Sequence, residues 1–153
     1  PAPFALLTSI DKEGRTNIMA VSWWTYLSNH PVKLGACLSN KGYSGGNIRE
    51  SGEFALCIVD QALKTAALGC GMCSGRSTDK AAELGIALTD AKAIAPKVVE
   101  ASKVIFECRL SDTVEIGDHT FYIADVAAVY GDESKKQLYA YDGYGRLGTA
   151  TEG

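Results

Sequence analysis

Hydrophobic and polar residues alternate in the last third of the chain, and a period of two residues is typical of β-strands with one buried face. Residues 104–116 and 119–130 are the two longest such segments, and Gly117-Asp118 lies between them. A short turn that contains glycine between two strands favours an antiparallel hairpin. A second hairpin is predicted at the start of the chain, from residues 4–10 and 16–24.

Shorter segments with recognisable starts and stops lie between the two hairpins. Two more strands are predicted at residues 33–38 and 53–59, and the first of them follows a break at residues 28–31. Capping residues and glycine stops predict three short helices, at residues 43–50 before Gly52, at 61–68 before Gly69 and Gly71, and after Asp79. Helices do not alternate regularly with strands, so the pattern favours a mainly β fold, an antiparallel barrel with helices capping its ends.

Composition and charge narrow the choice of function. The chain has 153 residues, 46% hydrophobic and 22% charged, which is typical of one globular domain, here residues 1–153. The net charge of −3 gives no basic surface for nucleic acid, and no apolar run reaches the roughly 18 residues of a membrane span. No secretion signal is visible and the cysteine count of five is odd, so we expect a cytoplasmic protein.

A loop rich in hydroxyl, glycine and lysine residues connects the strand at 33–38 to the helix at 43–50. It reads Ser39-Asn40-Lys41-Gly42-Tyr43-Ser44-Gly45-Gly46-Asn47-Ile48. Backbone N–H groups and the positive end of the helix dipole suit a phosphate group at such a helix start, and Lys41 adds a point charge. An ordinary glycine-rich loop before a capped helix is the alternative interpretation.

The segment Cys70-Gly71-Met72-Cys73 is a C-x-x-C motif. As half of a zinc site it lacks a second pair, because the other cysteines lie singly in strand segments. As a redox pair it lacks the thioredoxin context, a helix start in a βαβ fold. Two interpretations stay open: a dithiol that exchanges electrons with a cofactor, or two thiols without a shared role.

A series of short motifs in a fixed order carries a family resemblance along nearly the whole chain. Its members are Pro3 to Thr8, Thr16 to Trp23, Leu27-Ser28 before Pro31, Ser39 to Ile48, Gly52-Glu53-Phe54, Ser74-Gly75-Arg76 followed by Asp79-Lys80 and Leu84-Gly85, and Gly117-Asp118-His119 leading into Ile123 to Val126. With this series the chain resembles the flavin reductase-like, FMN-binding split-barrel family, which includes the flavoredoxins.

The resemblance implies a six-stranded antiparallel Greek-key split barrel, a homodimer and a bound FMN, with FAD as the alternative cofactor. It implies a flavin-dependent oxidoreductase that passes electrons from NAD(P)H through the flavin to an acceptor. Two other functions remain open within the same fold. One is a flavoredoxin-like electron carrier that keeps its FMN and exchanges electrons with a redox protein partner, and the other is a non-enzymatic flavin-binding module.

The resemblance also assigns site residues by position. An early strand would line the flavin ring, the loop before the first helix would hold the ribityl and phosphate groups, and a middle loop, a histidine and a tyrosine would complete the site. These residues are Asn17, Met19, Ala20, Val21 and Ser22; Ser39, Lys41, Tyr43, Ser44 and Asn47; Ser74, Gly75, Arg76 and Lys80; and His119 and Tyr144. His119 is the candidate catalytic residue, and an exposed histidine at a strand end is the alternative. Of the neighbours Trp23 and Trp24, at most one can face the site, because adjacent strand residues point to opposite sides.

Overall fold

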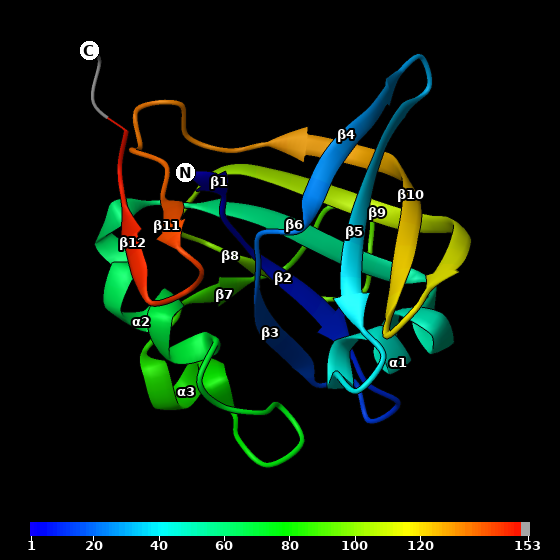
Figure 1. Ribbon diagram of the computed structural model, residues 1–153, viewed down its shortest axis with the longest axis horizontal. Helices are drawn as coiled ribbons and strands as arrows, with labels where there is room; N and C mark the ends of the chain where they lie inside the picture. Colours follow the sequence, from blue (N-terminus) through cyan, green and yellow to red (C-terminus); the bar gives the residue numbers. More distant parts are fainter. Residues whose placement is uncertain (151–153) are drawn as a thin grey trace.

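Seven antiparallel strands form the main sheet of the computed structural model, which describes residues 1–150. Their spatial order is β3-β2-β6-β9-β10-β5-β4, and the sheet curls around an apolar interior (Figure 1). The strands are β2 (Ala5–Ile10), β3 (Thr16–Val21), β4 (Trp24–Asn29), β5 (Val32–Ser39), β6 (Glu53–Val59), β9 (Ser102–Ile116) and β10 (His119–Tyr130). Both predicted hairpins are confirmed: β2 pairs with β3, and β9 pairs with β10 across a turn at Gly117.

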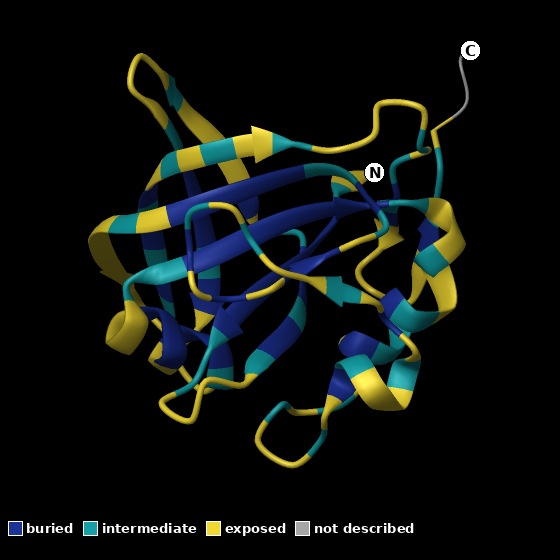
Figure 2. Cartoon of the chain, turned by 180° about the vertical axis from the view of Figure 1, so that it is seen from behind, coloured by how far each residue is buried: buried dark blue, intermediate teal, exposed yellow. Residues whose placement is uncertain are grey.

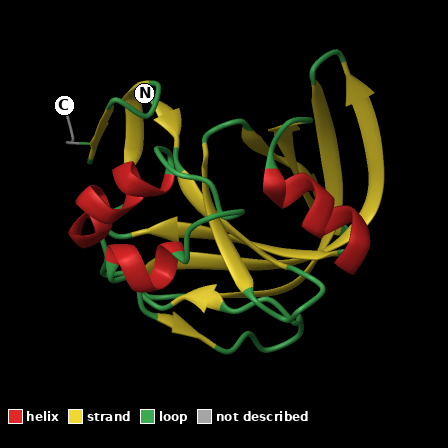
Figure 3. Ribbon diagram, turned by 90° about the horizontal axis from the view of Figure 1, so that it is seen from below, coloured by secondary structure: helices red, strands yellow, loops and turns green. Residues whose placement is uncertain are grey.

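Smaller elements cover the curled sheet, and the helices lie outside it (Figure 3). A three-stranded sheet brings the start and the end of the chain together, and a two-stranded sheet packs on β2, β6 and β9 of the main sheet. These strands are β1 (Ala2–Pro3), β11 (Tyr139–Asp142) and β12 (Arg146–Gly148), and then β7 (Leu88–Thr89) and β8 (Val98–Val99). The helices are α1 (Tyr43–Ser51), the 3-10 helix η1 (Gln61–Leu63), α2 (Lys64–Cys70) and α3 (Lys80–Leu84). None of the helices among residues 1–150 is long and apolar enough to cross a membrane.

Two details of the predicted elements are wrong. The strand predicted at residues 16–24 divides after Val21, and β4 begins at Trp24, so the main sheet has seven strands where six were expected. The predicted break at 28–31 is confined to residues 30 and 31, because residues 28 and 29 still belong to β4. β4 is an edge strand with mostly exposed side chains, and it therefore lacks the alternation that marks a half-buried strand. Gly69 does not end a helix either, since it lies inside α2. A Cβ at Gly69 would come within 2.7 Å of the Leu84 side chain, so the missing side chain lets α2 and α3 approach.

The core consists of two apolar clusters on opposite faces of the sheet. In β6, Phe54, Leu56 and Ile58 belong to the cluster inside the barrel, as predicted, and the residues between them belong to the outer cluster. Helix α1 closes one end of the inner cluster with Ile48 and ends at Gly52, whose φ of 72° is left-handed. The outer cluster is covered by α2, β8, β11 and β12, so the central strands are buried on both faces (Figure 2).

A buried carboxylate fastens the connection between β7 and β8 to the sheet. Glu107 of β9 is 0% exposed and accepts hydrogen bonds from the backbone N–H groups of Lys92 at 2.8 Å and Ala93 at 2.6 Å, and from the Tyr130 hydroxyl. Burial alone would raise the pKa of Glu107, but the hydrogen bonds together outweigh it and hold the pKa below the ordinary value of 4.5. The carboxylate therefore stabilises the fold in its charged form.

Replacing this carboxylate by an amide should destabilise the protein in a pH-dependent way. We expect Glu107→Gln to lower the free energy of unfolding at pH 7 by about 2–3 kcal/mol, because charge-assisted hydrogen bonds are lost. Since the folded-state pKa is depressed, this contribution is present above the unfolded-state value of about 4.3 and is lost as pH falls through the folded-state pKa. Urea unfolding at pH 7 and in acid measures it. Glu115→Gln, an exposed position on the same strand, is the control and should change stability by less than about 0.5 kcal/mol.

Candidate functional site

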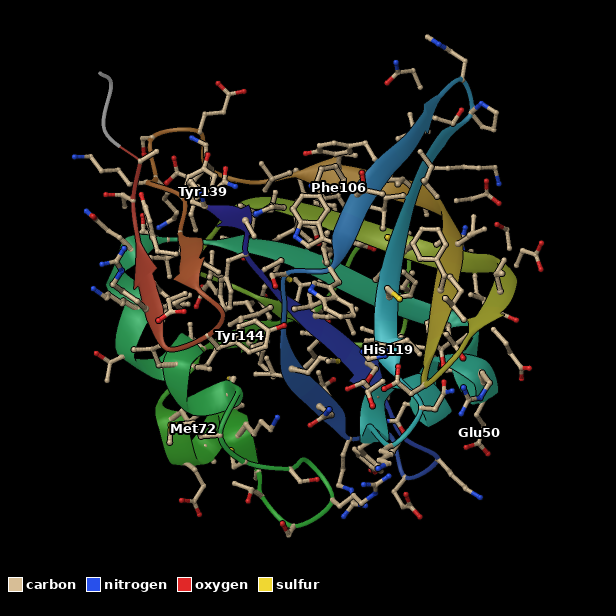
Figure 4. All side chains as sticks on the ribbon, in the orientation of Figure 1. Glu50, Met72, Phe106, His119, Tyr139 and Tyr144 are labelled. Carbon is tan, nitrogen blue, oxygen red and sulfur yellow. The ribbon has the colours of Figure 1, made fainter. Side chains whose placement is uncertain are left out.

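A cavity of about 650 Å³ lies between β3, the end of β5, the start of α1 and the loop that follows α2. It collects nearly all of the candidate residues, although they come from five separate parts of the chain. The candidates in its lining are Asn17, Met19, Ala20, Val21, Ser22, Ser39, Lys41, Tyr43, Ser44, Ser74, Gly75, Arg76, Lys80, His119 and Tyr144. His119 and Tyr144 approach it from different elements, β10 and the connection between β11 and β12 (Figure 4).

Asn47 is the candidate that does not line the cavity. It is the fifth residue of α1, more than one turn from the helix start. Its side chain is buried and its amide Nδ2 donates a hydrogen bond to Ser9 Oγ at 3.4 Å. Asn47 shares a helix face with Tyr43 and Ser44, but it lies one turn further along the axis, where its partner is Ser9 of β2 and the cavity has ended.

The apolar side of the cavity is an edge strand of the main sheet. Within residues 1–150, β3 pairs with β2 alone, and its residues from Met19 to Val21 line the cavity along the other edge, with its backbone N–H and C=O groups. Met19, Ala20 and Val21 supply short and flexible side chains along this edge. Just beyond the strand, the N–H of Ser22 donates to the hydroxyl oxygen of Tyr144 at 3.1 Å. The cavity therefore offers a flat, mostly apolar wall with backbone groups at its margin.

The other end of the cavity is positively charged. Helix α1 begins there after Gly42, and no side chain caps its first N–H groups. Ser39 Oγ accepts a hydrogen bond from the N–H of Lys41 at 3.3 Å, and the Arg76 guanidinium donates to the Lys41 carbonyl oxygen at 3.1 Å. The same guanidinium lies 5.8 Å from the centre of the Tyr43 ring. Uncapped N–H groups, a helix dipole and two cations make this end suited to an anion.

The loop after α2 packs directly on the floor of the cavity. Asn17 Nδ2 donates to Ser44 Oγ at 3.0 Å, and this buried bond joins β3 to the start of α1. A Cβ on Gly75 would overlap the side-chain amide oxygen of Asn17, so only glycine lets the loop approach this closely. The Ser74 hydroxyl accepts a hydrogen bond from the Arg76 N–H at 3.2 Å. Gly75 therefore brings the Arg76 cation to the same end of the cavity as Lys41.

An aromatic pair forms the rim on the β10 side. The ring of His119 lies 4.8 Å from that of Trp23, with the planes tilted by 33°. His119 Nδ1 is 2.7 Å from Asp118 Oδ1, and the hydrogen bond to His119 lowers the pKa of the Asp118 carboxyl. Trp23 is 61% exposed, whereas Trp24 is buried in the inner core. The prediction that only one of these tryptophans faces the site is thus confirmed.

Sequence reasoning did not place every lining residue. Cys37, one of the cysteines that lie singly in strand segments, is half-buried and lines the cavity two positions before Ser39, on the same side of β5. That spacing of two was the signal that could have found it. The C-x-x-C motif also reaches the lining through both of its cysteines. The further lining residues are Trp23, Leu38, Gly42, Gly45, Gly71 and Gly143.

Comparison with known proteins identifies the family. A family model described as "Flavin reductase like domain" matches residues 1–148. The chain belongs to the flavin reductase-like family. It is 30% identical to an uncharacterized protein of Aeropyrum pernix over 142 residues, which are 91% of this chain and 54% of that protein.

Solved structures of low sequence identity confirm the split-barrel fold of this flavin reductase-like chain. The flavoredoxin of Desulfovibrio vulgaris (Miyazaki F) superposes with a TM-score of 0.90 at 24% identity, over 99% of this chain and 88% of that one. An FMN-binding protein from Thermus thermophilus, with bound 1-cyclohex-2-enone, gives a TM-score of 0.87 at 24% identity, over 97% of this chain and 86% of that one. These likenesses establish the fold, and the site chemistry has to be argued from this chain's own residues.

A methyl group on Gly75 should disturb the contact between the loop and the cavity floor. We expect Gly75→Ala to lower the free energy of unfolding by about 1–3 kcal/mol, as overpacking does, because Asn17 is buried and tied to Ser44. Gly46→Ala is a control of opposite sign: nothing lies within 4 Å of a Cβ there, and alanine should stabilise helix α1 by about 0.5–1 kcal/mol. Urea unfolding of the two variants measures both. Equal stability of Gly75→Ala and the parent protein would contradict the close approach.

Proposed function

We propose that this chain is a flavin-dependent oxidoreductase that holds FMN in the cavity and passes electrons from NAD(P)H through it to an acceptor. The single observation that carries the proposal is the arrangement of one cavity. An uncapped helix start with Lys41 and Arg76 lies at one end, and an apolar edge strand runs along the wall. This arrangement matches flavin mononucleotide, which carries a phosphate group at one end and a flat ring system at the other.

The residues present fit FMN part by part. The phosphate dianion suits the first N–H groups of α1 together with Lys41 and Arg76. The ribityl hydroxyls suit the side chains of Ser39 and Ser44, which can both donate and accept. A side chain at position 45 would come within 2.6 Å of the Tyr122 hydroxyl, and Gly45 avoids this contact beside the helix start. The backbone edge of β3 suits a ring system that carries its own donors and acceptors.

The protein's share of the reaction is binding, orientation and control of the surroundings. Bound flavin supplies the redox chemistry, since it accepts a hydride from a reduced nicotinamide and can deliver the electrons onward. Lys41 and Arg76 would hold the phosphate group at the end of the cavity away from the ring, and this contact would set the position of the ring. The Tyr144 hydroxyl, held by the Ser22 N–H, borders the ring wall. Trp23 and His119 form an aromatic rim that can orient a nicotinamide and limit water, and no protein group is needed as a base.

We also propose that the protein is a homodimer that uses its β4–β5 arm. This hairpin projects from the barrel (Figure 1) and carries Tyr26, which is 61% exposed, with Leu27 and Val32 also exposed. Trp23, which directly precedes β4, lines the cavity and is 61% exposed. Exposed large apolar residues gathered on one projecting hairpin are typical of interaction surfaces. A partner at this surface would lie beside the flavin site.

An absorption spectrum tests the proposed activity directly. The purified protein is mixed with FMN and then given NADH or NADPH without oxygen. We expect a bound flavin spectrum that bleaches on addition of the nicotinamide, because ring and donor share one cavity. Bound flavin that neither nicotinamide reduces would replace the reductase by an electron carrier with a protein partner. A protein that takes up no flavin would overturn both.

A variant at Arg76 distinguishes binding of the phosphate group from binding of the ring. Arg76→Ala should weaken FMN binding about 10–100-fold, because a charge-assisted contact worth roughly 1.5–3 kcal/mol is lost. Riboflavin has the same ring without the phosphate, so its affinity should change much less. Fluorescence titration measures both affinities. An equal loss for the two ligands would place Arg76 at the ring or in the folding of the loop, contrary to the proposal.

The oligomeric state provides an independent test of the arm. Light scattering on the flavin-loaded protein should give the mass of two chains. Leu27→Glu should shift the protein toward the mass of one chain at the same concentration, because a charge would be buried without a partner. A monomer in the parent protein with flavin bound would contradict the proposed dimer.

A further inference from the structure

The C-x-x-C motif lies in one continuous turn. Cys70 is the last residue of α2, and the turn continues with hydrogen bonds from the N–H of Gly71 to Leu68 O at 3.2 Å and from the N–H of Met72 to Gly69 O at 3.0 Å. These turns end at Met72, and Cys73 follows directly with its Sγ 3.4 Å from the carbonyl oxygen of Gly69. The Cys73 thiol therefore lies against the peptide group that joins Gly69 to Cys70, which is the proximity that a disulfide, with roughly 4.4–6.8 Å between Cα atoms, requires.

The two thiols have different access to solvent. Cys70 is 2% exposed, and burial raises the pKa of its thiol to about 11 against the opposing effect of the Lys80 charge. Cys73 is half-buried, with its Sγ 3.4 Å from the carbonyl oxygen of Gly69. Between them Met72 is 87% exposed and lies at the outside of the turn (Figure 4). One thiol is thus sheltered and the other can be reached from outside.

A buried lysine accompanies the pair. Lys80, at the start of α3, is 5% exposed, and its Nζ donates to the carbonyl oxygen of Cys70 at 2.9 Å. Burial lowers the pKa of Lys80, and negative charge on either cysteine would raise it. A cation beside a thiol favours the thiolate, which is the reactive form. Burial also raises the thiol pKa values of Cys57 and Cys108, which are fully buried in apolar strands and, unlike Cys70, have no lysine from residues 1–150 among the groups that shift these pKa values.

We propose that Cys70 and Cys73 form a reversible disulfide that accepts an electron pair from the reduced flavin and passes it to an external disulfide. The inference rests on the proposed FMN site, because both cysteines line the same cavity as the residues that would hold the flavin. It names a disulfide as the class of acceptor for the proposed oxidoreductase. Cys73 is the thiol that meets this acceptor, since it is the more accessible of the two.

The electrons and protons of this exchange balance. Reduced flavin gives up two electrons and two protons, the Cys70–Cys73 bond breaks, and two thiols form while the flavin is left oxidised. The Cys73 thiolate then attacks one sulfur of the acceptor, and the first acceptor thiol leaves with a proton. The Cys70 thiolate attacks Cys73 Sγ, the second acceptor thiol leaves, and the Cys70–Cys73 bond is restored. The net change is oxidation of reduced flavin and reduction of one disulfide to two thiols.

The first measurement needs no flavin. The full chain is equilibrated in glutathione buffers of increasing oxidation, alkylated and mapped by peptide mass spectrometry. We expect a Cys70–Cys73 link in the parent protein and in Cys37→Ser, and no internal link in Cys73→Ser or Cys73→Ala. Cys37 is the matched control, because it is also half-buried in the same cavity but has no partner three residues away. Absence of the link under oxidising conditions would overturn the proposal.

The second measurement counts electrons in the flavin-loaded protein. Oxidised protein with FMN is titrated with dithionite without oxygen. The parent protein and Cys37→Ser should take up about four electrons per chain, two for the flavin and two for the disulfide, whereas Cys73→Ser should take up about two. Two electrons in all three proteins, with flavin bound, would overturn the thiol exchange and leave the proposed FMN function intact. Failure to take up FMN would overturn the proposed function, while the peptide map would still report whether the pair forms.

Discussion

Backbone N–H and C=O groups at the edge of a β-sheet need partners, and this constraint organises the whole molecule. The main sheet curls without closing, so β3 and β4 are left as its two edges. At one edge β3 turns its free side toward the cavity, where a ligand with its own donors and acceptors can pair with it. At the other edge β4 joins β5 in an arm with exposed aromatic and aliphatic side chains. Both features on which the functional proposals depend are consequences of the open barrel.

The lysine and arginine side chains in the cavity lining are positively charged, although the chain as a whole has a negative net charge. The protein carries a net charge of −3, yet Lys41, Arg76 and Lys80 all reach the lining. Two of these cations lie with the uncapped start of α1, and the third is buried beside the thiol pair. Within the lining, these cations lie where a phosphate or a thiolate would be held. Lys80 is buried, so solvent screens its charge less than it screens those of the exposed Lys41 and Arg76.

Local signals in the sequence predicted much of the fold, and the family resemblance selected most of the residues that line the cavity. The β2–β3 and β9–β10 hairpins follow from alternation and turn residues, and α1 ends at the predicted glycine. β4 was missed because an edge strand with exposed side chains has no periodic pattern. Asn47 lies outside the cavity lining because the rise of the helix, which a loop motif does not show, carries it one turn beyond Ser44 to Ser9. The position of the C-x-x-C motif in the cavity depends on how α2 packs, and no local pattern specifies that.

The loop between Cys70 and Arg76 connects the two chemistries of the cavity. It approaches the barrel most closely at Gly75, where a Cβ would overlap Asn17. Cys73 lies two residues before this glycine, and Arg76 follows it directly. Because so few residues separate them, the same short loop brings the accessible thiol and the cation to one cavity. The close packing of Gly75 on Asn17 therefore positions both chemical groups, and a side chain at residue 75 would displace both.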